Sequence, residues 1–272
     1  MALAKEQIAR YSRQLILSEI GVAGQQRLLR SSALVIGAGG LGCPAALYLA
    51  AAGVGTVGII DQEAVSLSNL HRQILHTSDD LGRPKALSAQ RQLTARNPDV
   101  IVHALVDRLT AANALAILRP YDVVLDGSDN FATRYLVNDA CVLLGKPLVH
   151  AGVVRLEGQL LTVLPRRSAC LRCLFPEPPQ PGAIPNCQEA GVMGTAAGIL
   201  GTLMAHEALK LLAPLGTPLT DRLLVFDGAA SRFREVALRR DPRCAVCGDA
   251  PTMHELVGLE DPACTDVQAS TA

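Results

Sequence analysis

A strand-like run passes directly into a glycine-rich turn in the stretch Ala33-Leu34-Val35-Ile36-Gly37-Ala38-Gly39-Gly40-Leu41-Gly42. A helix-like apolar segment continues over residues 41–52, so the glycines stand between a strand and a helix. Small residues at such a turn let the backbone approach a phosphate group, and the free N–H groups of the helix N-terminus favour an anion. The next strand, residues 56–60, ends at Asp61, where a carboxylate can accept hydrogen bonds from a ribose hydroxyl. The stretch therefore predicts a nucleotide-binding site.

Short β-branched runs alternate with helical patterns through the first 150 residues around this turn. Strands are expected at residues 33–36, 56–60, 100–105, 122–125 and 147–151, and helices at 41–52, 84–97, 111–118 and 130–144. This alternation is typical of an α/β protein with a mostly parallel, Rossmann-like sheet and helices on both faces. Two amphipathic helices are expected before it, with Ile8, Tyr11, Leu15 and Ile16 on one face of the first.

After residue 150 the pattern changes to longer strands of alternating polarity, such as residues 158–164 and 222–226. These strands predict an antiparallel extension of the sheet, interrupted by a proline-rich loop at residues 175–191. We therefore expect one domain over residues 1–248. It would comprise N-terminal helices (1–31), a nucleotide-binding half (32–152) and an antiparallel half (153–248), with a flexible tail at 249–272.

Composition excludes several classes of protein. The 272 residues hold 25 Lys plus Arg against 25 Asp plus Glu, and the aromatic residues are four Tyr and four Phe with no Trp. Neither a basic surface nor an aromatic stacking platform is available, so nucleic-acid binding is not expected.

The N-terminal segment carries Lys5 and Arg10 without an apolar run, which predicts a cytoplasmic protein. Residues 41–60 lack charge, but Gly53 and Gly55 interrupt them, so no membrane span is expected.

Polar residues also follow other strands of the predicted sheet. Ser68-Asn69-Leu70-His71-Arg72-Gln73 comes after Asp61, Lys85 stands at a helix start, and Gly127-Ser128-Asp129-Asn130 follows the strand at 122–125. The carboxyl ends of parallel strands meet at one edge of a sheet, so these residues are expected to gather there. A triphosphate needs added cations and a carboxylate for Mg²⁺, and the sequence supplies both. It therefore favours a nucleoside triphosphate over a dinucleotide.

Four of the eight cysteines form two Cys-x-x-Cys pairs, Cys170 with Cys173 and Cys244 with Cys247. Together they provide the four ligands of a tetrahedral zinc ion, and four thiolates leave no open coordination position. We therefore expect a structural zinc site formed when the fold brings two distant pairs together. Two unrelated loop pairs, or a redox pair, are the alternative.

Cys187 lies at the end of the proline-rich loop, in the segment Asn186-Cys187-Gln188. A cysteine in an exposed loop near the start of a helix can have a lowered pKa and act as a nucleophile. Spacing alone does not decide between this role and an inert residue. Cys43 and Cys141 are expected in the core, and Cys264 falls in the tail.

These motifs, in this order, resemble those of the ThiF/MoeB family, bacterial relatives of ubiquitin-activating enzymes. The resemblance spans residues 10–248 and is carried by Arg10-Tyr11-Ser12-Arg13-Gln14, the run 68–72, the turn 127–130 and both cysteine pairs. It implies an ATP-dependent adenylyltransferase that adenylates the C-terminal glycine of a ubiquitin-like sulfur-carrier protein and releases pyrophosphate. The carrier would serve molybdenum cofactor, thiamine or tRNA-thiolation pathways.

The resemblance also implies a role for individual residues. Gly40 would line the phosphate turn, Asp61 would bind the ribose, and Asp129 would hold Mg²⁺. The remaining nucleotide contacts would come from Ser68, Asn69, Leu70, His71, Arg72, Lys85 and Ser128. Arg13 would reach into the ATP site of the partner subunit of a homodimer.

Two further expectations concern sulfur transfer. Family members often have Ser or Thr before the loop cysteine, where this chain has Asn186, and Cys187 is the candidate for a covalent role. The rhodanese-like domain of some relatives is not expected after the second cysteine pair, so a separate protein would donate the sulfur.

Two other functions use some of the same features. An NAD-dependent oxidoreductase would use the glycine turn but would leave Arg72, Lys85 and Asp129 without a task. A non-catalytic binder of a ubiquitin-like protein would be indicated by loss of Asp129 or the arginines, and these residues are present.

Overall fold

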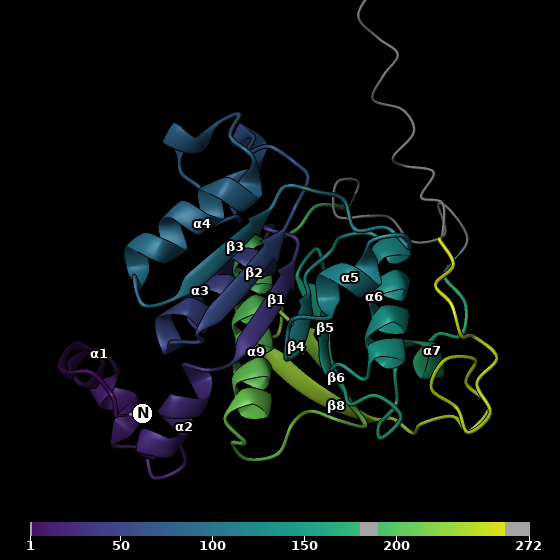
Figure 1. Cartoon of the computed structure of the whole chain (residues 1–272). Coiled ribbons are helices and arrows are strands. Elements are labelled where there is room, and N and C mark those ends of the chain that lie inside the picture. Colours follow the sequence, from purple (N-terminus) through teal and green to yellow (C-terminus); the bar gives the residue numbers. More distant parts are fainter. Residues whose placement is uncertain (1, 180–189, 259–272) are drawn as a thin grey trace, which may run out of the picture.

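The computed structural model describes residues 2–179 and 190–258, and within them eight strands form one sheet (Figure 1). The order across the sheet is β3-β2-β1-β4-β5-β6-β7-β8. The strands are β1 (Ser32–Ile36), β2 (Thr56–Ile60), β3 (Ile101–Leu105), β4 (Val123–Asp126), β5 (Leu148–Val154), β6 (Glu157–Val163), β7 (Arg222–Asp227) and β8 (Arg232–Ala237). Pairing is parallel from β3 to β5 and antiparallel from β5 to β8. The predicted parallel sheet with an antiparallel extension is confirmed.

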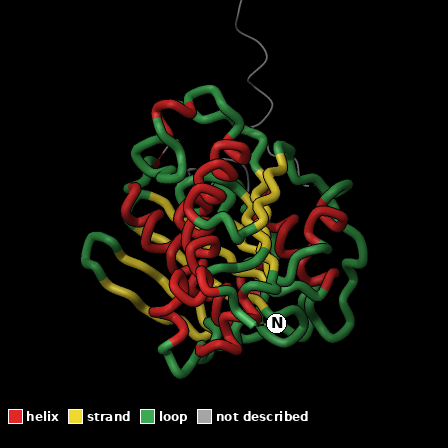
Figure 2. The backbone as a smooth tube through the Cα atoms, turned by 60° about the vertical axis from the view of Figure 1, so that its left-hand side comes forward, coloured by secondary structure: helices red, strands yellow, loops and turns green. Residues whose placement is uncertain are grey.

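Helices lie on both sides of the strands (Figure 2). One hydrophobic core contains residues of α3 (Gly42–Ala52), α4 (Lys85–Arg96) and α9 (Gly194–Leu212), and a second contains residues of α5 (Ala114–Leu118), α6 (Phe131–Leu144) and the short α7 (Leu171–Leu174). Two single-turn 3₁₀ helices, η1 (Leu67–Asn69) and η2 (Ser78–Asp80), lie between β2 and α4. No described helix is long and apolar enough to cross a membrane.

The glycine-rich turn joins β1 to α3 with almost no free space. A Cβ atom at Gly42 would lie 1.7 Å from the Gly37 carbonyl oxygen, and Gly37 has a φ of +85°. A side chain is therefore excluded at Gly42, and Gly37 adopts a conformation that favours glycine. The Gly37 N–H donates to the Ile60 carbonyl at 2.9 Å, which ties the turn to the end of β2.

The N-terminal helices α1 (Lys5–Leu15) and α2 (Gly21–Leu28) differ from the expected amphipathic pair in what they bury. Tyr11 is buried, and its hydroxyl accepts a hydrogen bond from Asn97 at 2.8 Å. Ile8 is 50% exposed and Ile16, just beyond the helix end, is 73% exposed. Of the residues expected on one face of the first helix, Tyr11 is therefore buried in this chain on its own, whereas Ile8 and Ile16 are exposed.

Two features of the C-terminal part also differ from the expectation. β8 was not predicted, because all six of its residues are exposed at the sheet edge and its sequence RFREVA has no buried apolar face. The chain does not become loose directly after Gly248, since the Thr252 and Met253 N–H groups donate to the Ala245 carbonyl at 3.0 and 2.9 Å. Met253 and Leu256 pack against the second core, so the packed region extends to residue 256.

Candidate active site

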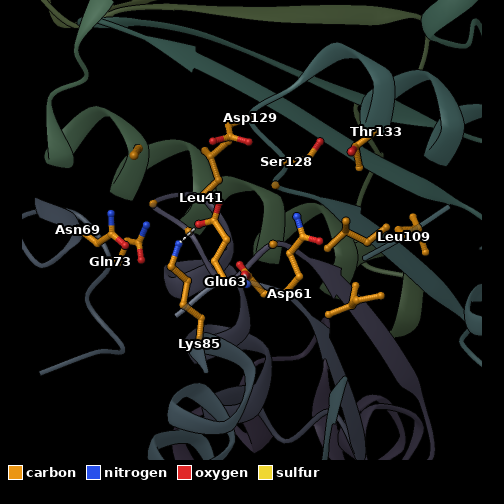
Figure 3. A pocket seen from close by; sticks show the side chains of 18 of the residues that line it. Leu41, Asp61, Glu63, Asn69, Gln73, Lys85, Leu109, Ser128, Asp129 and Thr133 are labelled. Atoms are coloured by element: carbon orange, nitrogen blue, oxygen red, sulfur yellow. Dashed lines mark hydrogen bonds and ion pairs between the residues drawn. The ribbon is translucent and has the colours of Figure 1, made fainter. Parts of the chain in front are cut away.

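A cavity lies at the carboxyl ends of β1, β2 and β4, beside the glycine turn (Figure 3). Residues from several separate loops converge on its wall. The sequence-predicted residues that line it are Gly40, Asp61, Asn69, Arg72, Lys85, Ser128 and Asp129. The structure thus brings together most of the expected nucleotide-binding set.

Three residues of that set do not line the cavity, although they belong to the same loop. Ser68 turns to the Ser66 hydroxyl, with 3.0 Å between the Oγ atoms, and exposed His71 places Nε2 2.8 Å from Arg72 Nη1. Leu70 is also absent from the described wall. Consecutive residues of a tight 3₁₀ turn point in different directions, so a contiguous motif cannot place every side chain in one site.

Asp61 fixes the backbone of the glycine turn. Its Oδ2 accepts the Ala38 N–H at 2.8 Å, and its Oδ1 accepts the Glu63 N–H at 2.8 Å. Burial raises the pKa of Asp61, while the nearby Lys85 cation and these two N–H groups act in the opposite direction. An ionised carboxylate accepts about four hydrogen bonds, so two bonds leave capacity for a ribose hydroxyl.

Lys85 begins α4 as a buried cation with a more exposed partner. It is 3% exposed, and its ammonium group forms an ion pair with the Glu63 carboxylate, whose side chain is 59% exposed. An isolated antiparallel bridge between Ala64 and Pro84 brings the two loops together, and the Lys85 N–H donates to the Glu63 carbonyl at 2.8 Å. The sequence reasoning missed Glu63, since this pairing depends on a contact between two loops.

Several buried polar atoms around the cavity have no hydrogen-bond partner. Within the described part of the chain these atoms are Gln73 Oε1, Ser128 Oγ and Arg134 Nε, and all three residues line the cavity. A buried polar atom without a partner is costly, so such atoms indicate a missing ligand or water. Their position fits a nucleotide with many polar groups. Arg134 was not among the predicted residues, and Gln73 was expected at this edge only as part of the run 68–73, without a role of its own.

The Ser128–Asp129 turn is held by a buried carboxylate at the end of β4. Asp126 accepts the Ser128 N–H at 3.0 Å and pairs with His150 Nδ1 on β5 at 2.8 Å. Burial opposes ionisation of Asp126, but the hydrogen bond from His150 and the other polar contacts leave its pKa below the ordinary value. Asp129 is exposed and lines the cavity, where its carboxylate provides the oxygen ligands that Mg²⁺ prefers.

The two cysteine pairs meet in the second core. Their four Sγ atoms lie within 4.8 Å of one another, with separations of 3.9 Å for Cys170–Cys173, 3.7 Å for Cys170–Cys244 and 3.3 Å for Cys173–Cys247. A tetrahedral zinc ion with Zn–S bonds of about 2.3 Å requires Sγ separations near 3.8 Å. Hydrogen bonds among the four thiols lower the pKa of Cys173 and Cys244 and raise the pKa of Cys170 and Cys247, so the four groups titrate as one cluster.

Arg172, between the first two cysteines, anchors this cluster to α6. It makes a bidentate ion pair with Asp139 (Nε–Oδ1 and Nη2–Oδ2, both 2.8 Å), and its guanidinium carbon lies 4.9 Å from the centre of the Tyr135 ring. The same α6 begins at the cavity, where Thr133 and Arg134 line the wall. One helix therefore contacts both the cavity and the cysteine cluster.

Two further predicted site residues, Arg13 and Cys187, are not assigned to the cavity by the described residues. Cys187 lies outside the described residues. Arg13 is exposed on α1 and is not among the described residues of the wall.

Comparisons with known proteins identify the family of the chain. The model of the ThiF family matches residues 11–246. The chain is 54% identical to the sulfur carrier protein adenylyltransferase of Thermus thermophilus, over 96% of this chain and 98% of that protein. It is 52% identical to the adenylyltransferase and sulfurtransferase MOCS3 of Anopheles gambiae, over 95% of this chain but only 59% of that protein's length.

Solved structures show the same fold. Escherichia coli MccB, crystallised with MccA-N7isoASN, superposes with a TM-score of 0.79 at 23% identity, covering 88% of this chain and 75% of that chain. PaaA superposes with a TM-score of 0.74 at 21% identity, covering 88% of this chain and 76% of that chain. With the family match over most of the chain and the close Thermus relative, the protein belongs to the ThiF family.

Proposed function

We propose that the protein is an adenylyltransferase that uses ATP to adenylate the C-terminal glycine of a ubiquitin-like sulfur-carrier protein. The observation that carries the proposal is the convergence of the glycine turn, Arg72, Lys85 and Asp129 on one cavity. An NAD-dependent oxidoreductase would not need this combination of cations and carboxylate. The name of the Thermus relative, a sulfur carrier protein adenylyltransferase, supports the same activity.

In the proposed reaction, a carboxylate oxygen of the carrier attacks the α-phosphorus of ATP. A new O–P bond forms, the bond between the α-phosphorus and the bridging oxygen breaks, and pyrophosphate leaves with that electron pair. A C-terminal carboxylate is already ionised at neutral pH, so the step needs no general base. Catalysis therefore depends on orientation and on stabilising charge at the phosphoryl oxygens.

The cavity residues are suited to that task. Lys85 and Arg72 supply positive charge and Asn69 supplies an amide donor. Asp61 would accept hydrogen bonds from the ribose. We infer that phosphate oxygens replace the Glu63 carboxylate as the partner of Lys85 when ATP binds. Asp129 would hold Mg²⁺, which neutralises phosphate charge when bound.

Arg13 is best explained by a second subunit. Gln14, its neighbour, donates to the Ala52 carbonyl at 3.1 Å at the C-terminal end of α3, whereas the glycine turn lies at the other end. The 11 residues of α3 separate these ends by about 16 Å. We propose that Arg13 completes the ATP site of the partner in a homodimer.

The four thiols would hold zinc in a structural role. Their Sγ positions fit a tetrahedral ion, and four protein ligands leave no position for a substrate. Cys187 is the candidate nucleophile for the later sulfur-transfer step, with the sulfur supplied by another protein.

The proposed activity is tested by exchange of labelled pyrophosphate into ATP, measured separately with carriers of the molybdenum cofactor, thiamine and tRNA-thiolation pathways. Exchange should require Mg²⁺ and one of these carriers, and a carrier lacking its C-terminal glycine serves as the control. Absence of exchange with every carrier, together with thermal stabilisation by NAD and none by ATP, would instead favour the oxidoreductase.

A further inference from the structure

Three separate segments form the phosphate side of the cavity. They are the glycine turn 37–40, the loop 69–73 and the start of α4 at Lys85. For the donors on these segments to act on one ligand, their relative positions must be fixed to well under 1 Å. His76 connects all three from behind the wall and is not among the described cavity-lining residues. Its imidazole contacts the glycine turn and α4, and its backbone N–H contacts the loop 69–73.

His76 is buried, with 5% of its surface exposed, and contacts each of the three segments. Its Nε2 lies 3.0 Å from the carbonyl oxygen of Ala38 in the glycine turn. Its Nδ1 lies 2.9 Å from the hydroxyl of Ser88, a fully buried residue in the first turn of α4. The backbone N–H of His76 donates to the Gln73 carbonyl at 3.0 Å, so His76 also closes the loop 69–73.

The chemistry of these partners determines the form of the imidazole. Burial lowers the pKa of His76, which favours the neutral ring. A carbonyl only accepts hydrogen bonds, so Nε2 must carry the proton that is donated to Ala38. Nδ1 is then the acceptor, and the Ser88 hydroxyl donates to it. The Ser88 hydroxyl therefore complements the tautomer that binds the glycine turn.

Both backbone polar groups of Ala38 are thereby held. Asp61 accepts its N–H at 2.8 Å, and its carbonyl oxygen receives the His76 Nε2–H and the Cys43 thiol, the latter at 3.2 Å. The next residues, Gly39 and Gly40, line the cavity. A residue held at both its N–H and its carbonyl keeps the following glycine backbone from rotating away from a bound phosphate.

On the basis of the proposed function, we propose that His76 is a positioning residue that fixes the phosphate-binding glycine turn relative to the loop 69–73 and α4. It does not touch the nucleotide. Its contribution is preorganisation, so its loss should weaken interactions with the phosphates and leave those with the nucleoside unchanged.

Three variants and two ligands test this proposal. The binding of ATP and of adenosine is measured on the full-length chain by calorimetric titration and competition. His76→Leu fills the space without a donor and should weaken ATP binding about tenfold, with adenosine binding within about twofold of wild type. His76→Gln keeps an N–H at the position of Nε2 and should recover most of the ATP affinity. Ser88→Ala, which removes one hydroxyl, should give a smaller loss with the same selectivity.

Pyrophosphate exchange gives a second readout, since the variants should raise the KM for ATP more than they lower kcat. Equal weakening of ATP and adenosine binding would show a merely structural role and overturn the proposal, as would unchanged ATP binding in His76→Leu. Should His76→Leu fail to fold, Ser88→Ala decides by the same two titrations. A wild-type chain that does not bind ATP would contradict the proposed function instead, so the two failures are distinguishable.

Discussion

The parallel and antiparallel halves of the sheet build their sites in different ways. In the parallel half, the glycine turn is contiguous and the polar residues of the cavity follow directly after strands. In the antiparallel half, four cysteines (170, 173, 244 and 247) form a thiol cluster inside a hydrophobic core. This cluster brings together cysteines 74 residues apart, such as Cys170 and Cys244. A cavity must stay open to its ligand, whereas a closed metal site is part of the packing.

Because of this difference, substitutions at the two sites should affect different properties, activity at the cavity and stability at the cysteine cluster. Asp129 is exposed, so its removal leaves no hole in either core. Cys170 is fully buried, so its replacement disturbs the core as well as the metal site. We therefore expect substitutions in the cavity to abolish activity in a folded protein and substitutions in the thiol cluster to unfold the protein.

The largest effect is expected from Cys170→Ser or Cys244→Ser. Binding of a structural zinc ion is coupled to folding, so loss of one thiolate should remove most of the soluble, folded protein. Wild-type protein should contain about one zinc ion per chain by metal analysis.

Cys141→Ser is the matched control, because Cys141 is equally buried in the same core but lies outside the cluster. It should keep the metal, at a cost of about 1–3 kcal/mol. The zinc assignment would be refuted if wild-type protein stripped of metal had the same free energy of unfolding as the protein before metal removal.

Asp129→Ala should reduce pyrophosphate exchange by about 10³-fold, because it removes the carboxylate that would hold Mg²⁺ at the phosphates. The free energy of unfolding should change by no more than about 0.5 kcal/mol, as for other exposed residues. Asp79→Ala, at an exposed carboxylate on η2 outside the cavity, is the control and should be fully active. Near-normal exchange by Asp129→Ala would contradict its assignment to the site.

Arg13→Ala should give a folded but inactive dimer, because the guanidinium is expected in the partner's site. Mixing it with Asp129→Ala subunits rebuilds one complete site in each mixed dimer, and random pairing should restore about a quarter of wild-type activity. Subunit exchange must be verified by native mass spectrometry. If mixed dimers form without recovery, Arg13 does not act across the interface.

The same contrast explains what the sequence predicts well. The order of strands and helices from β1 to β5 follows from local periodicity, and the glycine turn with Asp61 follows from local spacing. The thiol ligands were predictable because two Cys-x-x-Cys pairs define a complete ligand set. Their packing against α6 through Arg172 and Asp139 was not, because no local pattern records a contact between residues 33 positions apart.

Within the cavity, the residues missed by sequence reasoning depend on long-range geometry. Glu63 becomes the partner of Lys85 only through the bridge between residues 64 and 84. Arg134 was overlooked, and Gln73 was given no role of its own, because an unpartnered buried atom can be recognised only in three dimensions. Ser68 and His71 were included because their motif is contiguous, although the turn directs them elsewhere.

The smallest effect on adenylation is expected from Cys187→Ala, because a thiol has no role in that step. Adenylation uses the carrier carboxylate, ATP and Mg²⁺, so exchange should stay within about threefold of wild type. A defect should appear only when sulfur transfer to the carrier is measured with a donor present.

If Cys187 forms a covalent bond with the activated carrier, mass spectrometry should detect a thiol-sensitive adduct in wild type that is missing in the variant. The thiols of Cys43 and Cys141 should not form such an adduct, since burial raises the pKa of Cys43 to about 12 and that of Cys141 well above its usual value. A collapse of exchange itself in Cys187→Ala would place this residue in the ATP or carrier site and contradict the separation of the two steps.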